Sequence, residues 1–511
     1  MTTTDIPQQT EQRGKKKSED KPSMADVLLA MGRENYRFIR YAETTYAVAR
    51  QGPAIAVPLR ASGRGGTGSL RQQLTRLYAL KTGRAPSQSG LADAIATLDA
   101  LGSDATAQDV FLRAAPDPEV PGATWYDLGR PDGESLRILP GGGWTVQRPS
   151  VIHGPLWRRT RLTPQLTTPV RPEHGWEAAL GELRSLLPLT DDTWPQAVGW
   201  MLAGLLPDIP RPVAYLTGEQ GTGKSTAGRM LLRLLEGLAA DLQSMPRDED
   251  DLAVVASAGW VLALDNASKI PGWMSDALCR VVTGATSRKR ELFSDDDVAL
   301  LMYKRPSLLT GISVGAMRGD LAERMLRLAL EAIADSERRT ERDLWAAYRE
   351  MHGRVLGGLA ELAALVWAEL PNAATGMQDR PRMADWAELL WALDRVTGWK
   401  SLDAYLGEQD ALVEDVLDGD TVGKAVRKWC AAAREHRGTA PGEALAWEGT
   451  MSDLYPLLTE VRKGEYDDTW PRTAASLGGR LARVAPALRK RGIDVVRGRT
   501  GRQRTVRIAS T

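Results

Sequence analysis

Cysteine and long apolar runs are both scarce in this chain. The two cysteines, Cys279 and Cys430, lie far apart without the spacing of metal ligands. This argues against a disulfide framework and predicts a reducing compartment, the cytoplasm. No apolar run approaches the length that spans a bilayer, and the polar start over residues 1–22 resembles neither a signal peptide nor an anchor. We therefore expect a protein that does not have a membrane as its partner.

An excess of either charge is also lacking. The chain has 66 Lys and Arg against 65 Asp and Glu, a formal net charge of +1, and that total indicates no partner by itself. Residues 1–22 are expected to form a solvated, disordered tail, although their lysine triplet leaves open a nucleic-acid-binding arm. With 511 residues the chain exceeds one ordinary core, so several domains are predicted.

A phosphate-binding motif is present in the segment LTGEQGTGKST, residues 216–226. In the pattern G-x-x-x-x-G-K-[ST], glycines let successive N–H groups turn toward one anion. The lysine reaches the β- and γ-phosphates, and the hydroxyl that follows ligates Mg²⁺. The flanking residues predict a buried strand before the motif and a helix after it, which is the context that it needs. The predicted ATP-binding residues are Gly218, Glu219, Gln220, Gly221, Thr222, Gly223, Lys224, Ser225 and Thr226.

A second buried strand ends in an acidic residue. Residues 260–264 (WVLAL) form an unbroken apolar run, which is typical of a parallel strand covered on both faces. Asp265 follows at the carboxyl end, where it would hold the Mg²⁺ water shell opposite Ser225.

The position after Asp265 departs from what hydrolysis usually requires. Many ATPases of this kind place Glu there to orient the attacking water, whereas this chain has Asn266. An amide can hold a water but cannot accept its proton. Three interpretations stay open: another carboxylate such as Asp276 or Glu219 serves, hydrolysis is slow, or Asn266 only caps the turn.

Downstream residues predict a hairpin and two more strands. A basic cluster of Arg288, Lys289 and Arg290 is followed by an alternating segment, an acidic turn at residues 295–297 and the strand VALLMY. The next buried strand, SLLT, ends in Thr310, whose hydroxyl would contact the γ-phosphate or the water. A final apolar strand is expected directly after Arg318 and Arg324.

This order of motifs resembles the AAA+ helicases of superfamily 3 and the related phage and plasmid primase–helicase ATPases, in particular the ATP-binding proteins of actinobacterial phages and integrative elements. The match covers about residues 212–330. The resemblance implies a hexameric, ATP- and Mg²⁺-dependent DNA translocase that replicates a mobile element. It also implies that Thr310 is sensor 1 and that Arg324, ahead of Arg318, is the arginine finger that enters a neighbouring subunit's site.

Two features depart from that family pattern. One is Asn266, and the other is the hairpin tip, where residues 295–297 are three aspartates in place of the expected basic residue. Carboxylates repel DNA phosphates. DNA would then be held by Arg288, Lys289 and Arg290 at the hairpin base, or the motor moves its substrate differently.

The C-terminal unit concentrates positive charge. A first helix, and then either one long helix or a pair interrupted around Pro486, precede a strand–turn–strand segment, which is the outline of a winged helix. Basic residues greatly outnumber the single acid, Asp494, from residue 472 onward, which indicates phosphate binding. A merely solvated Arg-rich tail is the alternative. The predicted DNA contacts are Arg497, Arg499, Arg502 and Arg504.

The predicted architecture is therefore α/β, with a P-loop AAA+-type ATPase core. Its predicted parts are a tail (1–22), an α+β accessory domain (23–170), a helical lead-in with the core (171–335), a helical region (336–440) and a winged-helix-like domain (447–511). The leading function is an ATP-dependent helicase or replication initiator that binds single- and double-stranded DNA. An ATP-switched DNA-binding regulator and, less favoured, a small-molecule kinase are the alternatives.

Overall fold

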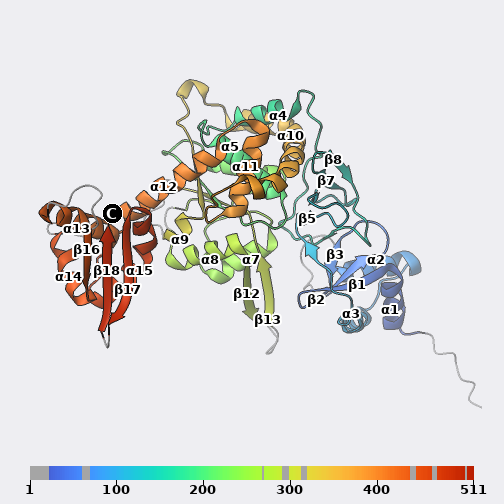
Figure 1. Ribbon diagram of the computed structural model, residues 1–511. Helices are drawn as coiled ribbons and strands as arrows, with labels where there is room; N and C mark the ends of the chain where they lie inside the picture. The colour runs from blue at the N-terminus through green and yellow to red at the C-terminus, as the bar shows by residue number, and fades with distance from the viewer. Residues whose placement is uncertain are drawn as a thin grey trace, which may run out of the picture. The chain divides into compact units, whose positions relative to one another are not determined.

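The computed structural model describes residues 22–59, 69–267, 270–290, 298–311, 319–437, 445–462, 469–500 and 503–510 (Figure 1). Contacts within the chain divide it into two units, Met1–Gln51 with Val57–Gln108, and Gly52–Ala56 with Asp109–Thr511. The division near residue 108 falls inside the segment 23–170 that the sequence predicts as one accessory domain. Among the described helices, none is long and apolar enough to cross a membrane.

The first unit packs three helices with a small sheet. Its elements are α1 (Met24–Asn35), β1 (Tyr36–Tyr41), β2 (Thr44–Ala49), β3 (Ala56–Pro58), α2 (Leu70–Thr82) and α3 (Gln88–Gly102). Strands β1 and β2 are antiparallel, as a tight turn between them requires. Ser23 caps α1 through a capping box with Asp26, which explains why the helix begins where the polar tail ends.

The second unit opens with short strands. These are β4 (Val110–Phe111), β5 (Ala114–Pro116), β6 (Thr124–Asp127), β7 (Ser135–Leu139), β8 (Gly143–Gln147) and β9 (Leu156–Trp157). Strands β5 to β8 form an antiparallel meander. Their inward residues, among them Tyr126 and Ile138, belong to the same hydrophobic core as the parallel sheet that follows.

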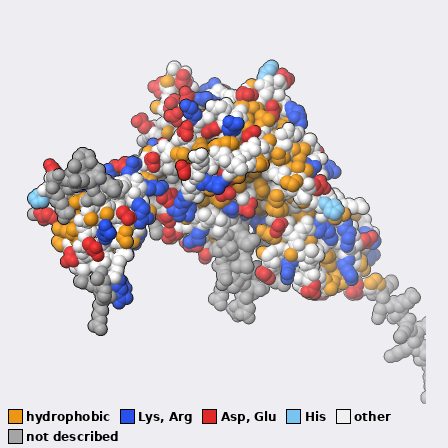
Figure 2. Space-filling model, viewed as in Figure 1, with side chains coloured by type: hydrophobic (Ala, Val, Ile, Leu, Met, Phe, Trp, Pro, Cys, Tyr) orange, Lys and Arg blue, Asp and Glu red, His pale blue; other side chains and the backbone are white. Residues whose placement is uncertain are grey.

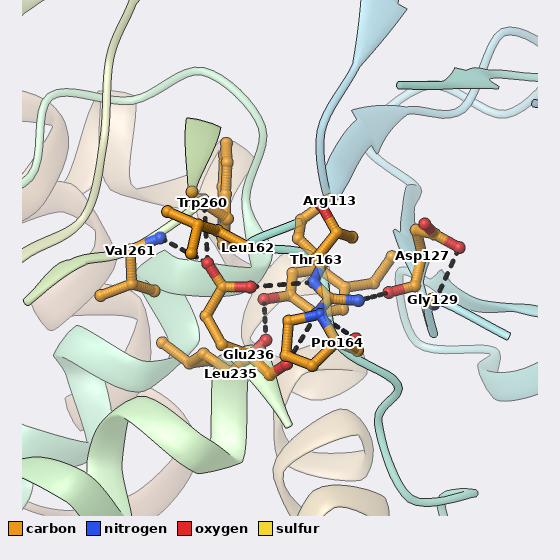
Figure 3. Close-up of polar contacts among 12 residues, drawn as sticks. Arg113, Asp127, Gly129, Leu162, Thr163, Pro164, Leu235, Glu236, Trp260 and Val261 are labelled. Atoms are coloured by element: carbon orange, nitrogen blue, oxygen red, sulfur yellow. Dashed lines mark hydrogen bonds and ion pairs between the residues drawn. The ribbon is translucent and has the colours of Figure 1, made fainter. Parts of the chain in front are cut away.

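A buried polar network fixes this meander to the end of helix α6 (Lys224–Glu236) (Figure 3). The Arg113 guanidinium donates to Glu236 Oε2 at 3.2 Å and to the Glu236 carbonyl at 2.6 Å. The other Glu236 oxygen accepts the backbone N–H groups of Trp260 and Val261, at 2.6 and 2.9 Å. The hydroxyl of Tyr126 donates to the Leu235 carbonyl at 2.8 Å.

The centre of the second unit is a parallel sheet of order β11-β14-β10-β15. Its strands are β10 (Val213–Thr217), β11 (Leu262–Leu264), β14 (Ser307–Thr310) and β15 (Met325–Ala329). Nearly all their residues are buried, as expected for parallel strands covered on both faces. The helices of this region are α4 (Gly175–Arg184), α5 (Trp194–Leu205), α6, α7 (Glu249–Ala258), α8 (Gly272–Thr283) and α9 (Gly319–Ala322).

Strand β11 is shorter than its apolar run predicts. The run begins at Trp260, but the ladder begins at Leu262, because the N–H groups of Trp260 and Val261 bond to the Glu236 carboxylate. The other predicted strands are confirmed at β10, β14 and β15. The predicted hairpin is confirmed as β12 (Ala285–Arg290) antiparallel to β13 (Val298–Tyr303).

Helices then lead to a second hydrophobic cluster. They are the 3₁₀ turn η1 (Asp335–Glu337), α10 (Glu341–Gly376), α11 (Ala384–Thr397), α12 (Ser401–Gly419) and α13 (Thr421–Arg437). The last elements are β16 (Leu445–Gly449), α14 (Met451–Glu460), α15 (Ala474–Lys490), β17 (Ile493–Thr500) and β18 (Gln503–Ser510), with sheet order β16-β18-β17. Of the two alternatives around Pro486, the single long helix is confirmed, because α15 continues through that residue.

The second cluster also includes residues of α13, among them Val422 and Val426. Its packed elements therefore begin upstream of the predicted start at residue 447. We call the segment from α13 to β18 the C-terminal unit.

Candidate nucleotide site and nucleic-acid surface

The glycine motif forms the turn between β10 and α6. Gly221 and Gly223 have φ of 88° and 75°, the left-handed region that glycine adopts without steric cost. A Cβ at Gly218 would lie 2.8 Å from Thr222 Oγ1. The Lys224 ammonium donates to the carbonyls of Gly218 and Glu219, at 3.0 and 2.6 Å. The turn thus ends at a helix N-terminus, an arrangement suited to anions.

Three polar side chains meet beside this turn. Ser225 Oγ, in the first turn of α6, donates to Asp265 Oδ1 at 2.8 Å. The buried hydroxyl of Thr310, at the end of β14, donates to the same oxygen. All three lie where β10, β11 and β14 end, the edge of a parallel sheet at which ligands bind. The sequence-predicted Ser225, Asp265 and Thr310 are therefore brought together.

This cluster suits a magnesium ion bound together with phosphates. Mg²⁺ prefers hard oxygen ligands, takes few of them from protein and keeps several waters. The Asp265 carboxylate and the Ser225 hydroxyl are such ligands. Within the described ranges, no group of three or more His, Cys, Asp or Glu side chains is arranged to hold a metal ion. A metal at this site would therefore depend on the nucleotide for further ligands.

Asn266 adopts a conformation that explains its residue type. Its φ is 57°, in the left-handed region, where asparagine is enriched among non-glycine residues. Asn266 is exposed, and its backbone N–H donates to Thr310 Oγ1 and to Asp265 Oδ1, with a nitrogen–oxygen distance of 3.1 Å in each case. Of the alternative carboxylates, Glu219 is exposed in the turn and Asp276 is half-buried on α8.

Arg324 lies at the opposite end of the sheet. Its carbonyl accepts the N–H of Val213, the first residue of β10, at 2.8 Å. The glycine turn follows the last residue of β10, and the length of β10 at ~3.3 Å per residue separates this turn from Arg324 by about 16 Å. The Arg324 guanidinium donates to the Asp320 carbonyl at 2.7 Å and contacts Cys279 Sγ at 3.8 Å. Arg324 is thus placed far from Lys224 of its own chain, and Arg318 lies outside the described residues.

The predicted DNA contacts lie on two hairpins. Arg288, Lys289 and Arg290 are on β12, opposite Leu300, Ala299 and Val298 of β13. The aspartates at 295–297 lie outside the described residues, as does Arg502.

The β17–β18 hairpin projects beyond the second cluster. Arg497 pairs with Val506, and Arg499 pairs with Arg504. By alternation these residues share a face with buried Val495 and Ile508, so the face is apolar at its base and basic toward its end. Arg497, Arg499 and Arg504 are exposed, and Lys and Arg side chains are visible beside the hairpin end in Figure 2.

Sequence reasoning missed a contact one residue before Arg324. Glu323 binds Arg382, in the connection between α10 and α11, and Lys490 of α15. These residues are far apart in the sequence, and no spacing pattern links them.

Family models match two adjoining parts of the chain. Residues 184–415 match the actinomycete integrative conjugative element replication protein, and residues 422–511 match the AICE RepA C-terminal domain. The first match includes the turn, Asp265, Thr310 and Arg324, and the second starts in α13. The chain is therefore similar to a replication protein family of mobile elements.

Several solved structures also resemble the chain. "SCCmec type IV Cch - active helicase" is 12% identical, with 93% of this chain and 92% of that chain covered and a TM-score of 0.42. The apo A form of the NrS-1 C-terminal region is 10% identical, with 96% and 98% covered and a TM-score of 0.38. A JCV helicase bound to a small molecule is 12% identical, with 47% and 65% covered and a TM-score of 0.23. No curated protein matches the chain.

Proposed function

We propose that the chain is an ATP-dependent DNA helicase or replication initiator of a mobile element. The observation that carries this proposal is the meeting of Ser225, Asp265 and Thr310 beside a glycine turn that ends in Lys224. The match to a replication protein family supports the biological setting. In finer terms, the core is a P-loop ATPase of the AAA+ type, akin to superfamily 3, and the C-terminal unit is a winged helix.

The turn residues bind the phosphates of ATP. Lys224, which here contacts the carbonyls of Gly218 and Glu219, exchanges those partners for the β- and γ-phosphates. Ser225 and Asp265 hold Mg²⁺, which when bound neutralises charge that develops on the phosphates during transfer. Thr310 orients the Asp265 carboxylate and stands next to the position of the γ-phosphate.

Arg324 acts on a neighbouring subunit's nucleotide. About 16 Å of strand separates it from its own turn, so its charge cannot reach the γ-phosphate in the same chain. An arginine supplied in trans stabilises the transition state of phosphoryl transfer. This requires a homo-oligomer, for which we propose a hexameric ring.

The two basic hairpins bind DNA. Arg497, Arg499, Arg502 and Arg504 contact phosphates of a duplex, and the basic cluster on β12 contacts the single strand. Arginine reaches phosphate oxygens without reading base edges, so this binding depends on salt more than on sequence.

One experiment tests the proposal. ATP turnover by the purified protein is measured with and without a forked DNA duplex, for the wild type, Lys224→Ala, Arg324→Ala and a mixture of the two variants. We expect stimulation by DNA, loss of turnover in each variant alone and partial recovery in the mixture, where intact sites form at shared interfaces. Arg324→Ala should cost about 10³-fold. Turnover in Lys224→Ala equal to the wild type would refute the site.

Asn266 favours a second candidate, an ATP-switched DNA-binding regulator. Its amide cannot take a proton from water, so ATP binding without appreciable turnover is the expected behaviour of that function. The same experiment separates the two, because such a regulator would bind ATP through Lys224 and show no DNA-stimulated hydrolysis.

A further inference from the structure

Glu323, the residue before Arg324, is held by two cations that are distant in the sequence, one in the α10–α11 connection and one at the end of α15. Its carboxylate accepts the Lys490 ammonium at 3.1 Å and also pairs with the Arg382 guanidinium. Its side chain is only 13% exposed. Burial raises the pKa of Glu323, but the hydrogen bonds from Arg382 and Lys490 outweigh that effect and leave the pKa below its ordinary value. Glu323 is therefore ionised at neutral pH.

The backbone leading to Arg324 packs against the C-terminal unit. Ala322, the last residue of α9, is 1% exposed and belongs to the second hydrophobic cluster, together with residues of α13 and α15. Lys490 is the last residue of α15. Two residues in succession, Ala322 and Glu323, are thus fixed by the C-terminal unit immediately before Arg324.

The contact between α15 and the ATPase core combines ion pairs with apolar packing and is incompletely filled. A cleft of about 470 Å³ lies there, with Glu323 and Arg382 among its lining residues on the core side and Arg483 and Val484 on α15. Nearby, Arg491 holds Glu414 of α12 at 2.9 Å. Ion pairs around a cleft can exchange partners at less cost than close apolar packing can be broken. A displacement of α15 would consequently first change the ion pairs of Glu323.

We propose that Glu323 is a positioning residue that couples DNA binding by the C-terminal unit to Arg324. When the C-terminal unit engages a duplex, α15 shifts, Lys490 carries the Glu323 carboxylate with it, and the adjoining Arg324 is reoriented toward the neighbouring subunit's nucleotide. This inference rests on the proposed function, because it needs both a DNA-binding C-terminal unit and a trans-acting Arg324.

The chain provides a matched control for testing this link. Arg489, one residue before Lys490, pairs with Asp494 at 2.9 Å inside the C-terminal unit. Lys490→Gln and Arg489→Gln each remove one positive charge at the same end of α15, but only Lys490→Gln removes a contact to Glu323. Lys490→Arg keeps the charge and serves as the rescue variant.

The experiment measures three quantities for each full-length variant: ATP turnover without DNA, turnover at saturating forked duplex, and duplex affinity by fluorescence anisotropy. We expect Lys490→Gln to match Arg489→Gln in DNA-free turnover and in affinity. Its stimulation by DNA should fall about fivefold or more, the usual lower range of an allosteric coupling. Glu323→Gln should lose stimulation likewise, and Lys490→Arg should retain it.

Two results would overturn the inference, and they are distinguishable. If the wild type is stimulated by DNA and Arg324→Ala is inactive, but Lys490→Gln is stimulated as strongly as Arg489→Gln, the coupling through Glu323 is wrong and the proposed function stands. If the wild type is not stimulated, or Arg324→Ala turns over ATP normally, the proposed function fails and the inference fails with it.

Discussion

Removing the Arg113 guanidinium should destabilise the second unit more than removing any typical surface charge. The Arg113 and Glu236 side chains are 1% and 4% exposed, so neither charge can be solvated when its partner is removed. Arg113 also donates to the carbonyls of Asp127 and Pro164, at 2.9 and 2.6 Å. Arg113→Met would leave the Glu236 carboxylate buried with only two backbone N–H donors.

Breaking a buried ion pair by removing one partner costs about 3–5 kcal/mol of unfolding free energy. Because each ~1.36 kcal/mol is a factor of ten, this corresponds to exchange about 10²- to 5 × 10³-fold faster at amides protected by that unfolding. We expect this acceleration for the amides of Trp260 and Val261, whose N–H groups bond to Glu236. Hydrogen exchange followed by mass spectrometry of peptides that contain them is the assay.

Arg247→Met is the matched control. Arg247 pairs with Asp251 at 2.7 Å, but its side chain is 85% exposed, so its loss should leave the unfolding free energy almost unchanged. If Arg113→Met accelerated exchange no more than Arg247→Met, the polar network would contribute little to the free energy of unfolding. Apolar packing alone would then hold the meander against α6.

Three further predictions concern the proposed DNA surface, the water position and pH. Replacing Arg497, Arg499 and Arg504 of the β17–β18 hairpin by alanine should weaken duplex binding for all sequences alike, flatten the log–log salt dependence by about one unit per lost contact and spare DNA-free ATP turnover. A change confined to one sequence would contradict this. Asn266→Gly should retain ATP turnover, because glycine accepts a φ of 57°. Asn266→Glu should lower the free energy of unfolding by about 1–2 kcal/mol, because glutamate is disfavoured in this left-handed conformation. If Asn266→Glu instead raised ATP turnover, the site would lack a base. Burial lowers the pKa of His352 from its ordinary 6.5, so below pH 6.5 the unfolded chain binds more protons than the folded chain, and stability is lost as pH falls from 6.5 toward the lower folded pKa. The melting temperature of His352→Gln should therefore fall less between pH 7 and 5.5 than that of the wild type. Equal decreases in the two proteins would refute this origin of the pH dependence.

The turn around Lys224 was predictable because its information is local. Three glycines, a lysine and a hydroxyl fix a backbone path within a few residues, and the flanking apolar runs fix the strand and the helix. The meeting of Asp265 and Thr310 was also within reach, since both follow apolar runs and the carboxyl ends of parallel strands share one edge. The conformation of Asn266 was not, because its residue type fits both a catalytic substitution and a left-handed turn.

Contacts between remote segments escaped prediction for a physical reason. Arg113 and Glu236 are 123 positions apart, and an arginine or glutamate in a sequence is as typical of a solvated surface as of a buried pair. The strands from residue 109 onward are too short to reveal which core they join. Similarly, α13 has the periodicity of any amphipathic helix, and only its packing in the second cluster assigns it to the C-terminal unit.

The distribution of these contacts determines which part of the second unit can move. Helix α6 begins at Lys224 and ends at Glu236, where it is held by the buried pair with Arg113. Along its length, Tyr348 of α10 donates to the Met230 carbonyl at 2.6 Å, and His352 Nε2 lies 3.0 Å from the Arg233 carbonyl. Because a carbonyl only accepts, that nitrogen carries the proton. A helix held by buried bonds moves as a rigid body when nucleotide binds, so the accompanying rearrangement should occur where ion pairs have partly exposed cations. Within the described part of the second unit, the cleft beside α15 is such a place, and the residue that leads to Arg324 lies on its wall.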